Sequence, residues 1–584
     1  MNGLNRRAFL TAAGAVGVAG AATGFGVSLG SGGSRAAAAV PPPSLALLRG
    51  GREHGAVGAA KAVAPSAAGT TLETAAAARG HAGYRRLAKG PGWQRVIRND
   101  LAGGKKGRDE RRKTLAAFAQ FTDLHIVDVQ HPLRYEYLRT ETASAWRPQE
   151  ALTIPATVAL IERVNALRNA PATGAPLSFV MTTGDNTDNN SKLELDWFLT
   201  AMSGGPIVPN SGDPKAYEGV QNSGLPLYWQ PESDHRDSDK KLGFPRVDGF
   251  LKAAIREAKS PGLNLPWYST IGNHDLLPGG CYGSSVNGFF ADFAVGGRKL
   301  ETLPPEQAAR AWKAVKKGLD PKGHDFEELL RSHRKKMRGV TPDLRRAPFS
   351  RREYVAAHLD PRHRGAGPVG HGYTRANLME GHLYYTFEIA PGVLGISLDT
   401  TDPGGDYRGS VGTSQLRWLE RTLKQAQRAD GAAYTIVFSH HTSETMTNTQ
   451  PDPSAPKEKR HGGDEVLELL KSHPGVLAWI NGHSHKNKIT PHGTLWEIST
   501  ASHIDYPQLA RIIELTDNGD GTLSLFTTLI ESAAPDAADL TDLTQTGLAA
   551  LYRELAFNAP APDRAEPLTG QPSDRNTELL LRKP

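Results

Sequence analysis

Residues 267–275 of the chain read WYSTIGNHD, a short aromatic and β-branched run followed by four polar or small residues. The run Trp267 to Ile271 favours a β-strand, and Gly272 marks its end. Asn273 offers an uncharged carbonyl oxygen, which can bind a metal ion without adding negative charge, and His274 stands beside it. Four such residues alone are equally consistent with a polar turn, so their meaning depends on the rest of the chain.

Four further polar blocks have the same form, because each follows a short apolar, β-branched or aromatic run. The runs are 115–121, 177–182, 435–439 and 476–481. Residues 155–167, between the first two runs, have helical spacing, and the order strand, helix, strand predicts a parallel pair with a crossover helix. Such a sheet gathers the residues that follow its strands at one edge. The blocks are Asp123-Leu124-His125, Gly184-Asp185-Asn186, His440-His441 and Gly482-His483-Ser484-His485.

Taken in order, the five blocks resemble the signature of the calcineurin-like metallophosphoesterase superfamily: D-x-H, G-D, G-N-H-[DE], a lone His after a strand, and G-H-x-H. The resemblance covers residues 123–500, and the segment 415–419 resembles the helix that precedes the lone-His block in that superfamily. It implies an α/β fold, a four-layer α/β/β/α sandwich with two mixed sheets between helices. It also implies a metal-dependent phosphoesterase.

Carried over by motif position, the resemblance implies two metal ions. Asp185 bridges them, and His440 rather than His441 is the lone-His ligand. Ligands with nitrogen and oxygen donors and no thiolate suit iron, manganese or zinc, and the sequence does not choose among these metals. The first ion takes Asp123, His125 and His485, and the second takes Asn273, His440 and His483.

The resemblance also assigns residues that act on the substrate or support the ligands. His274 stabilises the transition state or protonates the leaving oxygen, and Asp275 holds its ring. Asp399, at the end of a predicted strand, is a candidate to orient a ligand histidine. His441 is either a substrate contact or a surface histidine, and His503 is a candidate to approach the site.

One departure from a related pattern concerns Asp188. Purple acid phosphatases carry a tyrosine ligand three residues after the bridging aspartate, and this chain has Asp188 there. A purple iron site is therefore not expected, and we interpret Asp188 as a carboxylate that caps its loop.

Composition limits the class of protein. The 584 residues suffice for two to four domains, or for one large enzyme domain with long insertions. A net charge of +7 is too small for this length to indicate a nucleic-acid-binding protein. The single cysteine, Cys281, excludes an internal disulfide and a Cys-rich zinc cluster.

The ends of the chain predict an exported protein. Residues 1–39 are interpreted as a signal peptide, since residues 5–10 resemble a twin-arginine motif and Ala37–Ala39 offer a cleavage site; an uncleaved membrane anchor is the alternative. Residues 40–113 then form an N-terminal extension that straps onto the main domain. Residues 114–532 form the metallophosphoesterase domain, and residues 533–584 form a C-terminal helix and a mobile tail.

Two insertions are expected in the main domain, at about 204–245 and 279–375. The second contains helix-like runs at 305–318 and 325–337 and a basic cluster. That cluster is either a solvated helical cap or a lid whose cations meet an anionic substrate. Its members are Arg331, Arg334, Lys335, Lys336, Arg338, Arg345, Arg346, Arg351 and Arg352.

The expected function is dinuclear-metal-dependent hydrolysis of small phosphate esters, as a phosphomonoesterase or phosphodiesterase, outside the cytoplasmic membrane. The alternatives are a hydrolase of lipid-linked or envelope phosphates and a metal-binding scaffold without catalysis. The expected partners are the small phosphate-ester substrate and the twin-arginine export machinery. The high Ala, Gly and Arg content is consistent with a secreted actinobacterial type of this superfamily.

Overall fold

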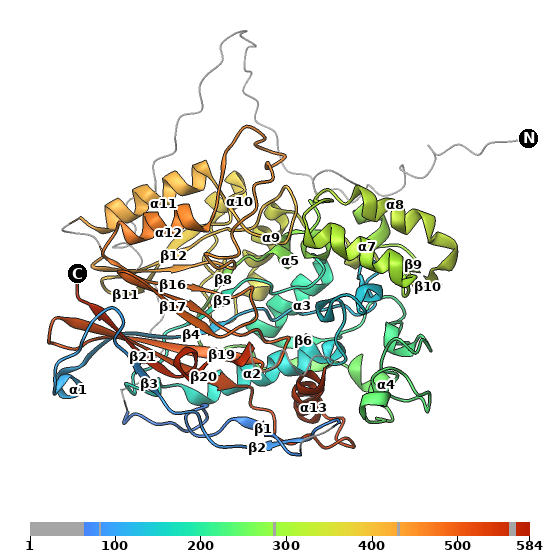
Figure 1. Ribbon diagram of the computed structural model, residues 1–584, viewed down its shortest axis with the longest axis horizontal. Helices are drawn as coiled ribbons and strands as arrows, with labels where there is room; N and C mark the ends of the chain where they lie inside the picture. Colours follow the sequence, from blue (N-terminus) through green and yellow to red (C-terminus); the bar gives the residue numbers. More distant parts are fainter. Residues whose placement is uncertain (1–62, 81–82, 284–287, 429–431, 560–567) are drawn as a thin grey trace, which may run out of the picture. The chain divides into compact units, whose positions relative to one another are not determined.

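Two mixed β-sheets form the centre of the computed structural model, which describes residues 63–584 apart from 81–82, 284–287, 429–431 and 560–567 (Figure 1). The expected signal peptide therefore lies outside the described residues. In the larger sheet, β4, β5 and β8 are parallel, β19 is antiparallel to β4 and to β20, and β21 is antiparallel to β20 but parallel to β3. Its order is β3 (Val96–Arg98), β21 (Thr577–Arg582), β20 (Thr522–Glu531), β19 (Leu509–Asp517), β4 (Lys113–Phe121), β5 (Val180–Thr183) and β8 (Trp267–Thr270).

The smaller sheet has four parallel strands with an antiparallel strand at each edge. The strands predicted at 115–121, 177–182, 267–271, 435–439 and 476–481 are β4, β5, β8, β14 and β16, so each predicted polar block follows an observed strand. The order of the smaller sheet is β11 (Tyr385–Ala390), β12 (Val393–Ser397), β14 (Tyr434–Phe438), β16 (Val476–Asn481), β18 (Leu495–Ser499) and β17 (Lys488–His492).

Aromatic side chains from both sheets fill the space between them. The ring of Phe118 on β4 stacks on Phe179 at 4.8 Å and meets Phe438 of β14 edge-on at 5.8 Å. Such rings bury large apolar areas and fix the separation of the two sheets. The alternation of inward-facing apolar residues along the strands thus builds one shared core.

Helices cover the outer face of each sheet, which confirms the four-layer sandwich (Figure 1). On the larger sheet, α2 (Thr153–Leu167) packs against β20 and against α13 (Gln545–Asn558), and α3 (Lys192–Ser203) packs beside α2. On the smaller sheet, α11 (Thr413–Ala426) and α12 (Gly463–Lys471) bury Leu419, Leu423 and Val466 against β12, β14 and β16.

The second insertion forms a cap with its own small core, in which Phe290, Phe326 and Leu330 are buried together. The run predicted at 305–318 is observed as α7. The run predicted at 325–337 is observed in part as α8, which ends at Ser332 and is followed by a separate 3-10 turn, Arg334–Lys336. Helix α9 was expected to belong to the cap, but its residues Tyr354 and Val355 are buried in the main core. The elements are α6 (Phe289–Ala294), β9 (Arg298–Lys299), α7 (Pro305–Lys316), α8 (His324–Ser332), β10 (Arg338–Gly339), α9 (Arg351–His358) and α10 (Arg375–Glu380).

The first insertion packs against the C-terminal helix. Trp229 and Phe244 share a buried cluster with Leu551 of α13. Regular structure near this insertion is short. It includes β6 (Gly205–Ile207), α4 (Phe250–Ala254) and β7 (Ala258–Ser260). Short α-helices and strands elsewhere in the described residues include β1 (Ala76–Ala78), β2 (Leu87–Lys89), α1 (Arg108–Arg111), α5 (Asn273–Leu276), β13 (Val411–Gly412) and β15 (Arg460–His461).

The C-terminal tail is not free, which corrects the prediction of a mobile end. Residues Thr577–Arg582 form β21, which pairs with β20 and, in parallel, with β3 of the N-terminal extension. Three consecutive leucines, residues 579–581, are at most 2% exposed, so burial of this strand stabilises the tail in the sheet. Within the part of the chain that the structure describes, no helix combines the length and apolar character that a membrane span needs.

Candidate metal centre

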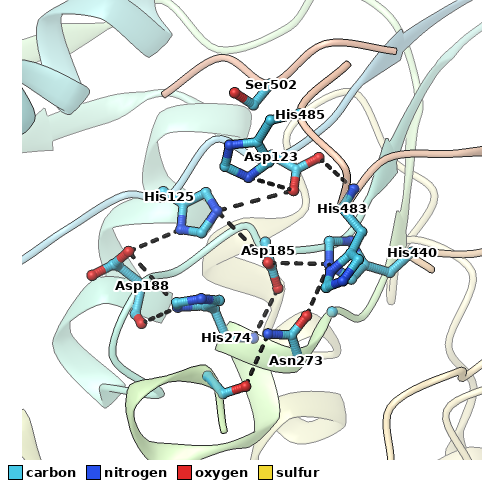
Figure 2. Close-up of polar contacts among 12 residues, drawn as sticks. Asp123, His125, Asp185, Asp188, Asn273, His274, His440, His483, His485 and Ser502 are labelled. Carbon is cyan, nitrogen blue, oxygen red and sulfur yellow. Dashed lines mark hydrogen bonds and ion pairs between the residues drawn. The ribbon is translucent and has the colours of Figure 1, made fainter. Parts of the chain in front are cut away.

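The predicted ligand blocks meet at the carboxyl ends of β4, β5, β8, β14 and β16 (Figure 2). Their backbone is unusual, since five of the seven predicted ligands have positive φ angles. Non-glycine residues in the left-handed region cost about 1–3 kcal/mol each and persist only where the surrounding structure enforces them. The angles are 51° at Asp123, 43° at His125, 48° at Asp185, 60° at His483 and 56° at His485.

Two glycines of the motifs are required by close packing. A Cβ at Gly272 would lie 2.3 Å from the backbone nitrogen of Asp185, and a Cβ at Gly482 would lie 2.0 Å from Oγ1 of Thr122. These contacts are far shorter than carbon atoms tolerate. The glycines therefore let neighbouring loops approach closely enough for their side chains to share one site.

The donor atoms of the seven predicted ligands converge. Nε2 of His440 lies 3.1 Å from a carboxylate oxygen of Asp185 and 3.1 Å from the amide oxygen of Asn273. On the other side of Asp185, Nε2 of His125 is 3.6 Å from its carboxylate. Asp123, His125 and His485 place one donor each within 4.8 Å of one another, and so do Asp123, Asp185 and His440.

Several of these atoms lack the partners that buried polar groups require. Oδ1 of Asp123 and Nε2 of His125 are buried without a hydrogen bond. Nε2 of His440 faces Nδ1 of His483, a carboxylate oxygen of Asp185 and the amide oxygen of Asn273, each at 3.1 Å, and a single N–H there can serve only one of them well. A divalent ion would satisfy all of these atoms, so four imidazoles, two carboxylates and one amide fit a two-metal site.

The electrostatics of the cluster also favour cations. Burial would lower the pKa of His440, but the charge of Asp185 and their hydrogen bond raise it to about 9. Burial would also lower the pKa of His485, but Asp123 and Asp505 raise it to about 10. Both imidazoles thus hold protons against the carboxylates, and a bound metal ion would take the place of those protons.

Two carboxylates orient ligand histidines, and the sequence assigned neither of them this role. Oδ1 of Asp188 lies 2.8 Å from Nδ1 of His125, and Oδ2 of Asp505 lies 2.6 Å from Nδ1 of His485. Each carboxylate is itself paired with a buried arginine, Asp188 with Arg134 and Asp505 with Arg147. Such partners fix the orientation of the imidazole and raise its basicity.

The interpretation of Asp188 as a loop cap is therefore wrong, because its carboxylate faces His125 and Arg134. The signal that could have identified it was its position in the loop of the bridging aspartate. His440, by contrast, is held by a backbone oxygen, since its Nδ1 is 2.8 Å from the carbonyl of Thr183.

His274 lies beside the ligands, as the sequence predicted, and its ring lines the cavity. Its Nδ1 is 2.7 Å from the backbone oxygen of Asp188 and 3.8 Å from that residue's carboxylate (Figure 2). Its backbone N–H donates to Oδ1 of Asp185 at 2.8 Å. The ring is therefore held in place through Asp188.

Asp275 does not hold the His274 ring, which corrects its predicted role. Its carboxylate accepts the backbone N–H of Gly272 at 2.9 Å and that of Thr187 at 2.8 Å, and it also accepts from the side chain of Asn186. It occupies the third position of the short helix α5, where a carboxylate folds back onto the helix start. Asp275 fixes the loop geometry of the site without contacting the reacting atoms.

Three further candidates also lie differently from expectation. Asp399 contacts Arg351 and the backbone N–H of Thr401 rather than a ligand histidine. His441 is fully buried, so it is not a surface histidine, and its ring nitrogens face Thr400 and the carbonyl of Tyr407. The backbone N–H of His503 donates to the carbonyl of Asp123, while its ring lies against Tyr552.

A cavity of about 580 Å³ opens over the site, with His125, Asp185, Asn273, His274, His483 and His485 in its wall. No member of the basic cluster lines this cavity, which argues against the lid hypothesis. Instead, Arg346 is buried on Asp128, while Arg338 pairs with Glu301. The cluster stabilises the cap and its junction with the main domain.

This placement gives a first prediction. Replacing both Arg331 and Arg334 with glutamine is expected to leave kcat and KM for a phosphate ester within about twofold of the parent values, because exposed charges far from a site are screened. Steady-state kinetics at two salt concentrations measure this. A severalfold rise in KM would instead restore the lid hypothesis.

No family model matches the chain. A manganese-dependent ADP-ribose/CDP-alcohol diphosphatase of Xenopus tropicalis is 30% identical over 89 residues, which are 15% of this chain. The match covers 24% of that relative, so the chain matches about a quarter of the relative's length.

Solved structures give weak likenesses. A dimetal phosphatase from Danio rerio aligns with a TM-score of 0.34 and 12% identity, covering 72% of this chain and all of that one. A purple acid phosphatase from yellow lupin aligns with a TM-score of 0.27 and 10% identity over 79% of this chain and 55% of that one. A putative 5'-nucleotidase from Staphylococcus aureus aligns at 0.27 with 13% identity, covering 71% and 54%.

Seven residues from five loops place their donor atoms together at one edge of a two-sheet sandwich, in the order of the signature. This arrangement and the short match to a manganese-dependent diphosphatase support the function proposed below.

Proposed function

We propose that this protein is a hydrolase of phosphate esters that uses two metal ions. The observation that carries this proposal is the convergence of seven residues with nitrogen and oxygen donors, two of whose buried atoms make no hydrogen bond, beside a cavity that five of the residues line. When bound, the ions supply Lewis-acid polarisation of the phosphoryl group and activation of water. An intact ligand set favours catalysis over the scaffold alternative.

The chain's own groups position the substrate and move a proton. His274 is held through Asp188 and its ring lines the cavity, so it can donate to the leaving oxygen of an ester bound above Asp185. Asn273 is fixed by a hydrogen bond from its Nδ2 to the carbonyl of Gly280 at 2.9 Å, which turns its Oδ1 toward the ligand cluster. These contacts pre-form the site before a substrate arrives.

Metal removal tests this function directly. Dialysis against a chelator is expected to abolish turnover of p-nitrophenyl phosphate, and two equivalents of Mn²⁺ are expected to restore it. Because the ions bind the folded state only, ligand at a hundred times Kd adds about 2.7 kcal/mol to the free energy of unfolding. Mass spectrometry of the metals and thermal unfolding with and without Mn²⁺ provide the measurements. Full activity in the metal-free protein contradicts the proposal.

A second candidate is hydrolysis of organic diphosphates. The relative's name gives ADP-ribose and CDP-alcohols as its substrates, and a cavity of about 580 Å³ has room for much more than a phosphate group. A panel of p-nitrophenyl phosphate, bis-p-nitrophenyl phosphate and ADP-ribose, with equal Mn²⁺, separates the three classes. The substrate with the highest kcat/KM identifies the class. p-Nitrophenyl phosphate indicates a monoesterase, bis-p-nitrophenyl phosphate a diesterase, and ADP-ribose a diphosphatase.

The proposed place of action is outside the cytoplasmic membrane. The support is the twin-arginine-like segment at residues 5–10 and the alanines at 37–39. Replacing Arg6 and Arg7 with lysine should retain the protein in the cytoplasm, which cell fractionation measures. Unchanged export would assign these residues another role.

A further inference from the structure

One part of the cavity wall comes from the cap helix α7 and contains none of the predicted ligands. On this helix Ala308, Ala311 and Val315 pack into the core of the cap. Trp312 does not join that core. Its half-buried indole lines the cavity and has no ring partner or hydrogen bond among the described residues.

A large aromatic side chain without partners is costly to leave against water. Lys316 follows Trp312 by one helical turn and therefore lies along the same edge of α7. It also lines the cavity. The apolar row of α7 therefore packs in the cap, while the indole of Trp312 and the ammonium group of Lys316 line the cavity.

A second wall comes from the end of α13 and the loop after β18. The rings of Phe557 and Tyr506 meet edge to face with centroids 4.8 Å apart, and both line the cavity. This contact fixes the Phe557 ring, so it presents a formed apolar surface. The cavity therefore has apolar walls from two separate elements in addition to its metal ligands.

Lys486 follows the predicted ligand His485 directly and lines the same cavity. Lys316 and Lys486 are both exposed, and in the described part of the chain neither makes an ion pair or a hydrogen bond. Arg147, which also lines the cavity, is already paired with Asp505. The two lysines are therefore free to meet a negative charge on a ligand.

We propose that Trp312, Lys316, Lys486 and Phe557 form a subsite, here called the α7 subsite, for the group attached to the scissile phosphate. The ligand that fits is an aromatic ring carrying a second negative charge. A cavity of about 580 Å³ accommodates such a group beside a phosphoryl group held over Asp185 and Asn273. This inference deepens the proposed function and rests on it.

Non-hydrolysable phosphonates test the subsite without interference from leaving-group chemistry. Calorimetric titration of the Mn²⁺-loaded protein would compare methylphosphonate, phenylphosphonate and 4-carboxyphenylphosphonate. Phenylphosphonate is expected to bind about tenfold more tightly than methylphosphonate because its ring is buried. The carboxylate is expected to add a further gain of about two- to fivefold that declines with salt.

Variants separate the two contributions. Trp312→Ala should remove the advantage of the ring, Trp312→Phe should retain most of it, and the double variant Lys316→Gln, Lys486→Gln should remove the advantage of the carboxylate. Methylphosphonate should bind equally to all of them. Lys313→Gln, on the same helix but outside the cavity wall, and Leu319→Ala, 66% exposed, are the matched controls.

Thermal unfolding of each variant shows whether the fold is retained. The α7 subsite is overturned if phenylphosphonate binds no more tightly than methylphosphonate. It is also overturned if Trp312→Ala weakens the binding of all three phosphonates equally. If none of the three phosphonates binds the metal-loaded protein and no ester is hydrolysed, the proposed function fails and the subsite fails with it.

Discussion

The variant His274→Ala is expected to keep both metal ions and to lose about 10²–10⁴-fold in kcat, the usual contribution of a positioned proton donor. The physical reason is that His274 lies beside the ligands without being one of them. Its Nδ1 is held by the backbone oxygen of Asp188 at 2.7 Å, and its ring lines the cavity. Steady-state kinetics with metal content by mass spectrometry test this.

The choice of ester distinguishes the two roles left open for His274. If it protonates the leaving oxygen, the loss in kcat should be large for an alkyl phosphate and small for p-nitrophenyl phosphate, whose leaving group needs no proton. If it stabilises charge on the phosphoryl oxygens, both esters should lose equally. A variant with near-normal kcat on both esters removes His274 from the mechanism.

The variant Asp188→Ala is expected to damage metal binding and turnover together. Its carboxylate is the partner of Nδ1 of His125, and loss of such a partner weakens metal affinity by about 10–100-fold. The same carboxylate lies 3.8 Å from Nδ1 of His274 and pairs with buried Arg134. The lower kcat should therefore persist at saturating Mn²⁺.

Asp399 offers a matched control for this experiment. It also follows a core strand, but its carboxylate contacts Arg351 and a backbone N–H instead of a ligand histidine. Asp399→Asn is expected to leave the Mn²⁺ affinity unchanged in calorimetric titration. Asp188→Asn keeps an acceptor oxygen for His125, so its Mn²⁺ affinity should lie between those of the parent protein and Asp188→Ala. Equal effects at both positions would show that Asp188 has no special role.

The strands and the convergence of the ligands could be predicted because they depend on local pattern. Each of the five blocks follows a β-branched or aromatic run, and glycines such as Gly272 and Gly482 mark where loops pack too closely for a Cβ. The prediction of a mobile C-terminal tail was wrong because the pairing of its strand does not depend on local pattern. The strand β21 is stabilised by pairing with β20 on one side and β3 on the other, and both are distant from it in sequence.

The sequence by itself determined the seven candidate ligands, the helices and strands that carry them, and the position of His274. The helices and strands follow from periodicity along the chain, and the ligands and His274 are what the resemblance in motif order implies. Only the tertiary structure decided which carboxylates support which histidines. Asp188 and Asp505 face His125 and His485, whereas Asp275 caps its own helix start and Asp399 pairs with Arg351. A carboxylate's partner depends on side-chain direction across loops far apart in sequence, and residue type and spacing do not encode that direction.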